Sequence, residues 1–159
     1  MRQNGSDVTV RRFHRDLDRI LEIEKESFGR RAWKADVFRQ YAAQHPDFFL
    51  VAKVGSTIAA YSITSTRGDR AELDSIAVAR DYRNRGIGRA FLSILIGKLQ
   101  QMGFSTLSLM VRRDNVAAIR FYRGMGFRRI RTVPFYYEGG ETAWRMRLVL
   151  NQRAERATI

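Results

Sequence analysis

The chain has 159 residues, a net charge of +13 and no cysteine. This length fits one domain with one hydrophobic core, and the lack of cysteine excludes disulfides, thiolate metal ligands and a cysteine nucleophile. An apolar run of about 18 residues, which a membrane-spanning helix needs, is missing, and His14 and His45 have no partner at metal-binding spacing. We expect a single domain over residues 1–159, with its core at about 8–150 and a frayed tail at 151–159.

Apolar periodicity predicts seven strands and four helices in the order βααβββαβαββ. This order indicates a mixed α/β fold with an antiparallel start and one βαβ crossover. The expected strands are Val8–Phe13, Phe48–Val54, Thr57–Thr66, Ala71–Ala79, Ser105–Val111, Phe127–Val133 and Thr142–Leu150. The expected helices are Asp16–Phe28, Lys34–Ala43, Gly88–Met102 and Asn115–Arg123.

The segment RNRGIGRA, residues 83–90, connects a predicted strand to a predicted helix inside the crossover. A helix N-terminus offers free N–H groups and a positive dipole end, glycine lets a ligand approach the backbone, and arginine pairs with phosphate oxygens. The segment therefore predicts a phosphate or pyrophosphate site. It lacks both the third glycine of a dinucleotide fingerprint and the Gly-Lys of a P-loop. A tight turn with incidental arginines is the alternative.

A second motif lies in NVAAIRFYRGMGF, residues 115–127. Asn115 and Tyr122 are two helical turns apart on one face, about 10 Å along the axis, and Ala118 between them keeps that face shallow. Such a strip suits an elongated ligand. Alternatively, Phe121 and Tyr122 are core aromatics of an amphipathic helix.

Together, IAVARDYRNRGIGRAFL (residues 76–92) and NVAAIRFYRGMGF resemble the GCN5-related N-acetyltransferase (GNAT) superfamily. The resemblance covers about residues 8–150. It implies a mostly antiparallel central sheet of about seven strands flanked by about four helices. It also implies acetyl-CoA as the acetyl donor, with no metal.

The resemblance assigns roles to individual residues. The backbone of Ile76, Ala77 and Val78 pairs with the pantetheine arm, Asn115 contacts it, and Tyr122 gives a proton to the leaving thiolate. The pyrophosphate is held by Arg83, Asn84, Arg85, Gly86, Ile87, Gly88 and Arg89. A phenol with a pKa near 10 can protonate a thiolate whose conjugate acid has a pKa near 8.5. Without cysteine, direct transfer is favoured over an acyl-cysteine route.

Glu72 and Asp74 share one face of a predicted strand because strand side chains alternate. Several members of the superfamily carry a general-base glutamate where Glu72 stands, so we predict that Glu72 deprotonates the acceptor amine, through water if needed. Asp74 then orients the substrate ammonium. The alternative is a pair of acids that merely balances nearby arginines.

Within the superfamily, the chain is most similar to the ribosomal-protein-alanine N-acetyltransferase branch. The similarity rests on ESFGRRAW (residues 26–33), the Asn115 helix, and Tyr136 and Tyr137 before the last strand. It implies a protein N-terminal α-amine as acceptor, contacted by Tyr136 and Tyr137. Two residues depart from the pattern: Met110 replaces a glutamate that many branch members carry, and Glu138 replaces a proline.

Other acceptors and roles stay open at this level. A small-molecule amine, such as a polyamine or aminoglycoside, is one alternative, and a non-catalytic CoA-binding or ribosome-associated module is another. The cationic surface argues against polycationic acceptors, although Glu72, Asp74, Glu138 and Glu141 can form an acidic pocket. No basic run reaches five residues, so most of the charge is expected on a solvated surface, and the absence of an RNA-stacking motif in the sequence argues against direct nucleic-acid binding. We expect a cytoplasmic monomer or homodimer without membrane contact.

Overall fold

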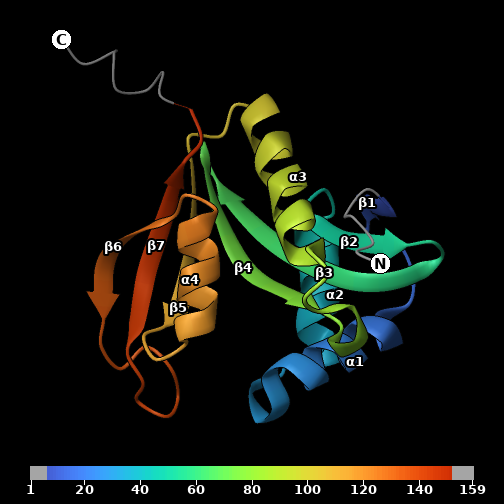
Figure 1. Cartoon of the computed structure of the whole chain (residues 1–159), viewed down its shortest axis with the longest axis horizontal. Coiled ribbons are helices and arrows are strands. Elements are labelled where there is room, and N and C mark those ends of the chain that lie inside the picture. Colours follow the sequence, from blue (N-terminus) through green and yellow to red (C-terminus); the bar gives the residue numbers. More distant parts are fainter. Residues whose placement is uncertain (1–6, 152–159) are drawn as a thin grey trace. The chain divides into compact units, whose positions relative to one another are not determined.

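The computed structural model describes residues 7–151, and its elements follow the predicted order (Figure 1). Each element end differs from its predicted end by at most one residue. Two short 3₁₀ turns, η2 (Gly29–Arg31) and η3 (Arg80–Tyr82), add to the predicted set. The strands are β1 (Val8–Arg12), β2 (Phe49–Val54), β3 (Thr57–Arg67), β4 (Arg70–Val78), β5 (Thr106–Arg112), β6 (Arg128–Val133) and β7 (Ala143–Val149). The α-helices are α1 (Leu17–Phe28), α2 (Ala35–Gln44), α3 (Ile87–Gln101) and α4 (Val116–Gly124).

The seven strands form one sheet in the order β1-β2-β3-β4-β5-β7-β6. Strands β1 and β2, β2 and β3, β5 and β7, and β6 and β7 pair antiparallel, whereas β4 and β5 pair parallel. The parallel pair follows from the crossover through α3, since a parallel neighbour cannot be reached by a hairpin. The predicted mixed, mostly antiparallel fold is confirmed.

Two compact units are distinguished within the described residues. The first comprises residues 7–65 and 75–95, and the second comprises residues 66–74 and 96–151. The expectation of a single domain stays a prediction. Of the predicted tail, Asn151 donates a hydrogen bond from Nδ2 to the carbonyl of Phe104 at 2.8 Å; residues 152–159 lie outside the described residues.

The core of the first unit is formed chiefly by apolar side chains from α1, α2, β2 and β3, with Ala77 from β4. Ile20 and Ile23 are fully buried, as the helical spacing of apolar residues in α1 predicts. The ring of Phe38 from α2 packs edge-on against Tyr61 of β3 at a centroid distance of 5.6 Å. These contacts fix α1 and α2 within the unit.

One charged side chain, Glu24 of α1, lies inside this core with 2% of its surface exposed. Its Oε1 accepts a hydrogen bond from the backbone N–H of Trp33 at 2.8 Å, and its Oε2 accepts one from the Tyr61 hydroxyl. The Tyr61 oxygen also lies 3.1 Å from Oγ of Ser75 on β4. Glu24 therefore joins the segment between α1 and α2 to two strands. Burial raises the pKa of Glu24, and the hydrogen bonds from Trp33 and Tyr61 oppose that rise.

The buried carboxylate generates a stability prediction. Replacing Tyr61 with Phe removes one of the two donors, and we expect it to lower the free energy of unfolding at pH 7 by about 1–3 kcal/mol, the usual effect of leaving a buried polar group without a partner. The loss should shrink as the pH falls through the folded-state pKa of Glu24, because a protonated carboxyl no longer buries a charge.

Urea unfolding of wild type and Tyr61→Phe between pH 7 and pH 4.5 measures this difference. Tyr82→Phe serves as the control, because no described hydrogen bond involves the Tyr82 hydroxyl. A loss in Tyr61→Phe that stays constant over this pH range would contradict an ionised Glu24 as the group that Tyr61 stabilises.

Candidate functional site

The connection from β4 to α3 has the backbone of an anion-binding loop. Asn84 and Gly86 adopt positive φ angles of 60° and 76°, and α3 starts directly afterwards at Ile87. The first N–H groups of any helix lack acceptors within the helix, and turns of this kind direct neighbouring N–H groups to one side. Asn84, Arg85 and Gly86 are exposed. The loop can therefore bind a phosphate group through its backbone.

The three arginines of the loop differ in their surroundings. Arg83 donates hydrogen bonds to the carbonyl of Val78 and to Oγ of Ser27, each at 3.0 Å. The guanidinium of Arg85 lies over the Tyr82 ring at 5.3 Å, and Arg89 is exposed on the first turn of α3. Arg83 thus shapes the loop through protein contacts, while Arg85 and Arg89 stand at its surface. Roles for all three as phosphate ligands stay predictions.

Helix α1 braces this loop, which the sequence motifs did not indicate. Oε2 of Glu26 accepts a hydrogen bond from the backbone N–H of Arg80 at 3.1 Å. The next residue of α1, Ser27, accepts the hydrogen bond from Arg83. Glu26 and Ser27 belong to the ESFG segment, to which the resemblance assigned no role. Their hydrogen bonds give both residues a structural role, which is to hold the loop between β4 and α3.

The end of β4 extends beyond its pairing with β5, and the carbonyl of Val78 there accepts the hydrogen bond from Nε of Arg83. The parallel pairing with β5 covers Arg70 to Leu73, so the backbone groups of Ile76 to Val78 take no part in that pairing. The Ala77 side chain is buried in the first-unit core, which leaves only its backbone for ligand contact. This arrangement fits an extended ligand that carries amide groups.

Asn115 caps α4. Its Oδ1 accepts a hydrogen bond from the backbone N–H of Ala118 at 3.2 Å, the usual contact of an N-cap residue. A local structural function therefore explains this asparagine, and its predicted contact with a ligand rests on the remaining Nδ2 donor.

Tyr122 is partly buried among aromatic rings. Its ring packs edge-on against Phe121 at 5.4 Å and Phe127 at 5.7 Å. Burial raises the pKa of Tyr122 to about 12, with a smaller contribution from Tyr137. These contacts fit the alternative of a packed aromatic residue as well as a catalytic role, and the phenol keeps its proton at neutral pH.

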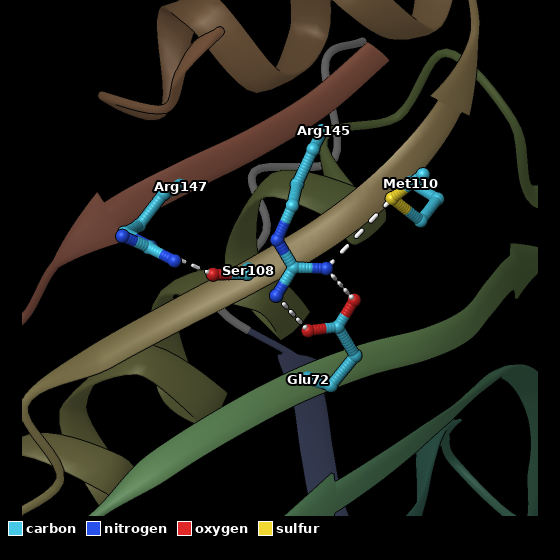
Figure 2. A network of polar contacts seen from close by, with 5 residues as sticks. All are labelled: Glu72, Ser108, Met110, Arg145 and Arg147. Carbon is cyan, nitrogen blue, oxygen red and sulfur yellow. Dashed lines mark hydrogen bonds and ion pairs between the residues drawn. The ribbon is translucent and has the colours of Figure 1, made fainter. Parts of the chain in front are cut away.

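Glu72 and Arg145 form a bidentate ion pair in the second unit (Figure 2). Nη1 and Nη2 of Arg145 donate to the two oxygens of Glu72 at 3.0 and 2.9 Å, and Nη1 lies 3.8 Å from Sδ of Met110. Arg147 alongside donates from Nε to Oγ of Ser108 at 3.1 Å. The Arg145 side chain therefore reaches from β7 across β5 to β4.

The register explains this cluster. Glu72 is opposite Ser108, Ser108 is opposite Arg147, and Met110 is opposite Arg145, so all five side chains lie on one face. Arg145 and Arg147 were missed as functional candidates. Their signal in the sequence is the alternation Trp-Arg-Met-Arg-Leu over residues 144–148. The structure favours Glu72 as the partner of an arginine, and its role as a general base stays a prediction.

Tyr136, Tyr137 and Asp74 complete the predicted residues of the second unit. Tyr136 is half-exposed, and its pKa is raised by burial and by the charges of Glu72 and Asp74. Its ring meets that of Tyr137 edge-on at 4.9 Å. The structure thus brings Glu72, Asp74, Arg145 and Tyr136 together. The loop of residues 83–89 belongs to the first unit, and Asn115 and Tyr122 belong to the second.

Within residues 7–151, no group of three or more His, Asp or Glu side chains is placed to hold a metal ion. No helix in the same range has the length and apolar character needed to cross a membrane.

Comparisons with known proteins agree with this architecture. The model of the acetyltransferase (GNAT) family matches residues 16–127. Ribosomal protein bS18-alanine N-acetyltransferase of Escherichia coli (strain K12) is 41% identical over 139 residues, covering 86% of this chain and 93% of that protein. N-alpha-acetyltransferase RimI of Mycobacterium tuberculosis is 32% identical over 138 residues, covering 83% and 85%. The crystal structure of the Escherichia coli enzyme superposes with a TM-score of 0.81, covering 96% of this chain and 99% of that chain.

Substitutions at Asn115 can distinguish its effect as the helix cap from any effect of a ligand contact. We expect Asn115→Ala to lower the free energy of unfolding by about 1 kcal/mol, because the Ala118 N–H loses its acceptor. Asn115→Asp keeps that acceptor and should stay within a few tenths of a kcal/mol of wild type. Equal losses in both variants, measured by urea unfolding, would exclude the cap as the source of the effect.

The pKa of Tyr122 can be measured directly. In a protein labelled with ¹³C at the tyrosine ring carbon bonded to oxygen, the resonance of a freely solvated tyrosine shifts around pH 10. The resonance assigned to Tyr122 through Tyr122→Phe should instead stay constant up to about pH 10.5, as burial of the neutral phenol requires. A Tyr122 midpoint near pH 10 would contradict this.

Proposed function

The chain belongs to the acetyltransferase (GNAT) family and is an N-acetyltransferase with acetyl-CoA as donor, and we propose that its acceptor is a protein N-terminal α-amine. The observation that carries the proposal is the near full-length similarity to two enzymes named for this chemistry, ribosomal protein bS18-alanine and N-alpha-acetyltransferase. An α-amine also suits the chemistry, because its pKa near 8 makes it easier to deprotonate than a lysine, whose pKa is about 10.4.

The first-unit loop and the end of β4 are the proposed contacts for acetyl-CoA, which supplies the thioester. Backbone N–H groups at the start of α3, with Arg85 and Arg89, neutralise the pyrophosphate. The backbone of Ile76 to Val78 binds the pantetheine amides, and Nδ2 of Asn115 adds a donor. Glu26 and Ser27 hold the loop in place through Arg80 and Arg83.

Tyr122 is the proposed donor to the leaving thiolate. With its pKa raised to about 12, the phenol holds its proton more tightly than an ordinary tyrosine. Complete transfer to a thiolate, whose conjugate acid has a pKa near 8.5, is therefore less favourable than it would be from an exposed tyrosine. Tyr122 then acts by a hydrogen bond that strengthens as negative charge grows on sulfur.

Glu72 is the proposed acceptor of the amine proton. Arg145 binds both of its oxygens, and each oxygen keeps a second lone pair that can accept a hydrogen bond from the amine or an intervening water. Arg145 thereby orients Glu72. Asp74 and Tyr136 are the proposed further contacts of the same ammonium, since the charges of Glu72 and Asp74 both contribute to raising the pKa of Tyr136. Met110 supplies no carboxylate on β5.

We propose a cytoplasmic location, where ribosomes and acetyl-CoA are present.

Acetyl transfer to peptides tests the acceptor and both proton-handling residues. CoA release should be fastest with short peptides that carry a free N-terminal alanine, and slower with an N-blocked lysine peptide, spermidine or an aminoglycoside. Tyr122→Phe and Glu72→Gln should each lower kcat at least about tenfold, within the range expected for a positioned acid or base.

Tyr41→Phe, which removes a phenol from α2, should retain wild-type turnover. Faster turnover with the small amines would overturn the proposed acceptor while leaving acetyl transfer intact. Wild-type kcat in Glu72→Gln would exclude Glu72 as the base.

A further inference from the structure

Four arginines share one face of the edge hairpin formed by β6 and β7. Arg145 and Arg147 lie two residues apart on β7, so their side chains point the same way. Arg131 is directly opposite Arg145, and Arg128 is directly opposite Arg147. We call these four residues the arginine face. Figure 2 shows its β7 half beside Ser108 and Glu72.

An irregularity in β6 creates this face. The register shifts between Arg129 and Arg131, so one extra residue, Ile130, is inserted. Without it, Arg128 and Arg131 would point to opposite faces, because they are three residues apart. Arg129 instead pairs with Met146 on the other face, where its guanidinium lies over the Trp144 ring at 4.6 Å.

The arginine face carries more positive charge than its surroundings balance. Like charges directly opposite each other in a sheet destabilise it, and here two such pairs stand side by side. Arg145 has a carboxylate partner, Glu72. Among the described residues, no ion pair involves Arg128 or Arg131, and Arg147 contacts the neutral Ser108.

Acids are few in the segment that carries the arginine face, and two of the three are engaged elsewhere. Residues 112–147 contain nine arginines and three acids, a net charge of +6. Two of the acids, Asp114 and Glu141, lie 2.7 and 3.9 Å from Arg112, and the third, Glu138, is exposed in the β6–β7 connection. The positive charge of the arginine face is therefore not balanced within this segment, and an anion from outside the chain would be attracted to it.

We propose that the arginine face binds acidic side chains of the acceptor polypeptide, in the residues that follow its reacting N-terminus. The inference rests on the proposed function and adds a substrate class to it: protein N-termini followed by Asp or Glu. One end of the face is the Glu72–Arg145 pair, beside which Asp74 and Tyr136 lie. A chain whose α-amine is placed at Glu72 can continue over Arg131, Arg147 and Arg128.

The geometry favours a polypeptide over RNA. Alternate side chains of an extended peptide repeat at about 6.8 Å, the same spacing as alternate arginines on a strand. The face is two strands wide, about 5 Å between strands, which offers few phosphate contacts. Aromatic stacking platforms are typical of single-stranded RNA sites, and Trp144 lies on the opposite face, under Arg123 and Arg129.

The test compares two peptides that share an N-terminal alanine and differ at positions 2–6, where one carries Asp and Glu and the other carries Asn and Gln. We expect wild type to show a kcat/KM about tenfold higher for the acidic peptide in low salt, with a smaller ratio as NaCl screens the charges. The double variant Arg128→Gln/Arg131→Gln should reduce the ratio to about twofold and leave turnover of the amide peptide unchanged.

Arg129→Gln is the matched control, because it removes the same charge from the same strand on the opposite face. It should keep the wild-type ratio. The double variant should also unfold at a temperature equal to or above that of wild type, because it removes opposed like charges. A wild-type ratio near one, or an equal loss of ratio in Arg129→Gln, would overturn the inference.

Two further measurements separate this inference from the proposed function. If neither peptide is acetylated, the proposed acceptor is wrong; fluorescence anisotropy with the labelled acidic peptide then tests the face alone, and binding that does not weaken in the double variant overturns it. The same assay is run with a single-stranded RNA oligonucleotide. If the RNA binds more tightly than the acidic peptide, and if its binding requires Arg128 and Arg131, the arginine face is an RNA site and the inference is overturned.

Discussion

Strand β5 sets the register on which the second unit depends. It pairs in parallel with β4 and antiparallel with β7, so Glu72, Ser108 and Arg147 fall in one row and Met110 and Arg145 in the next. A slip of one residue would send Leu107 and Leu109, which are now buried, to the polar face. Burial of these leucines therefore holds the polar row in place, and the Glu72–Arg145 pair can form only in that register.

Helix α1 has the corresponding position in the first unit. Its apolar side packs into the core, while three polar side chains within about one turn near its C-terminal end contact other segments. Glu24 holds the backbone at Trp33, Glu26 holds the backbone at Arg80, and Ser27 binds Arg83. The segment after α1 and the proposed pyrophosphate loop are thus tied to one helix. Few side chains then determine the shape of two separate loops.

The two groups proposed to handle protons are held by different contacts. Burial raises the pKa of Tyr122 to about 12, so its phenol is neutral at pH 7, whereas Arg145 binds both oxygens of Glu72 and fixes the position of that carboxylate. Neighbouring side chains therefore set the position of each group. A prearranged site of this kind stabilises charge without reorganisation in the reaction.

The sequence by itself determined the order of the elements, the mixed sheet and the family, because these depend on local periodicity and on short motifs such as residues 83–90 and 115–127. It also named Glu72, Asp74, Tyr122 and the tyrosine pair as candidates. Tertiary structure decided what these residues contact. Strand register places Arg145 opposite Met110, and the register shift at Ile130 brings Arg128 and Arg131 to one face. The contact between Arg83 and Ser27 joins segments that are distant in sequence. Alternation along one strand divides its side chains between two faces of the sheet. Only the pairing with a neighbouring strand decides which side chains of the two strands lie on the same face.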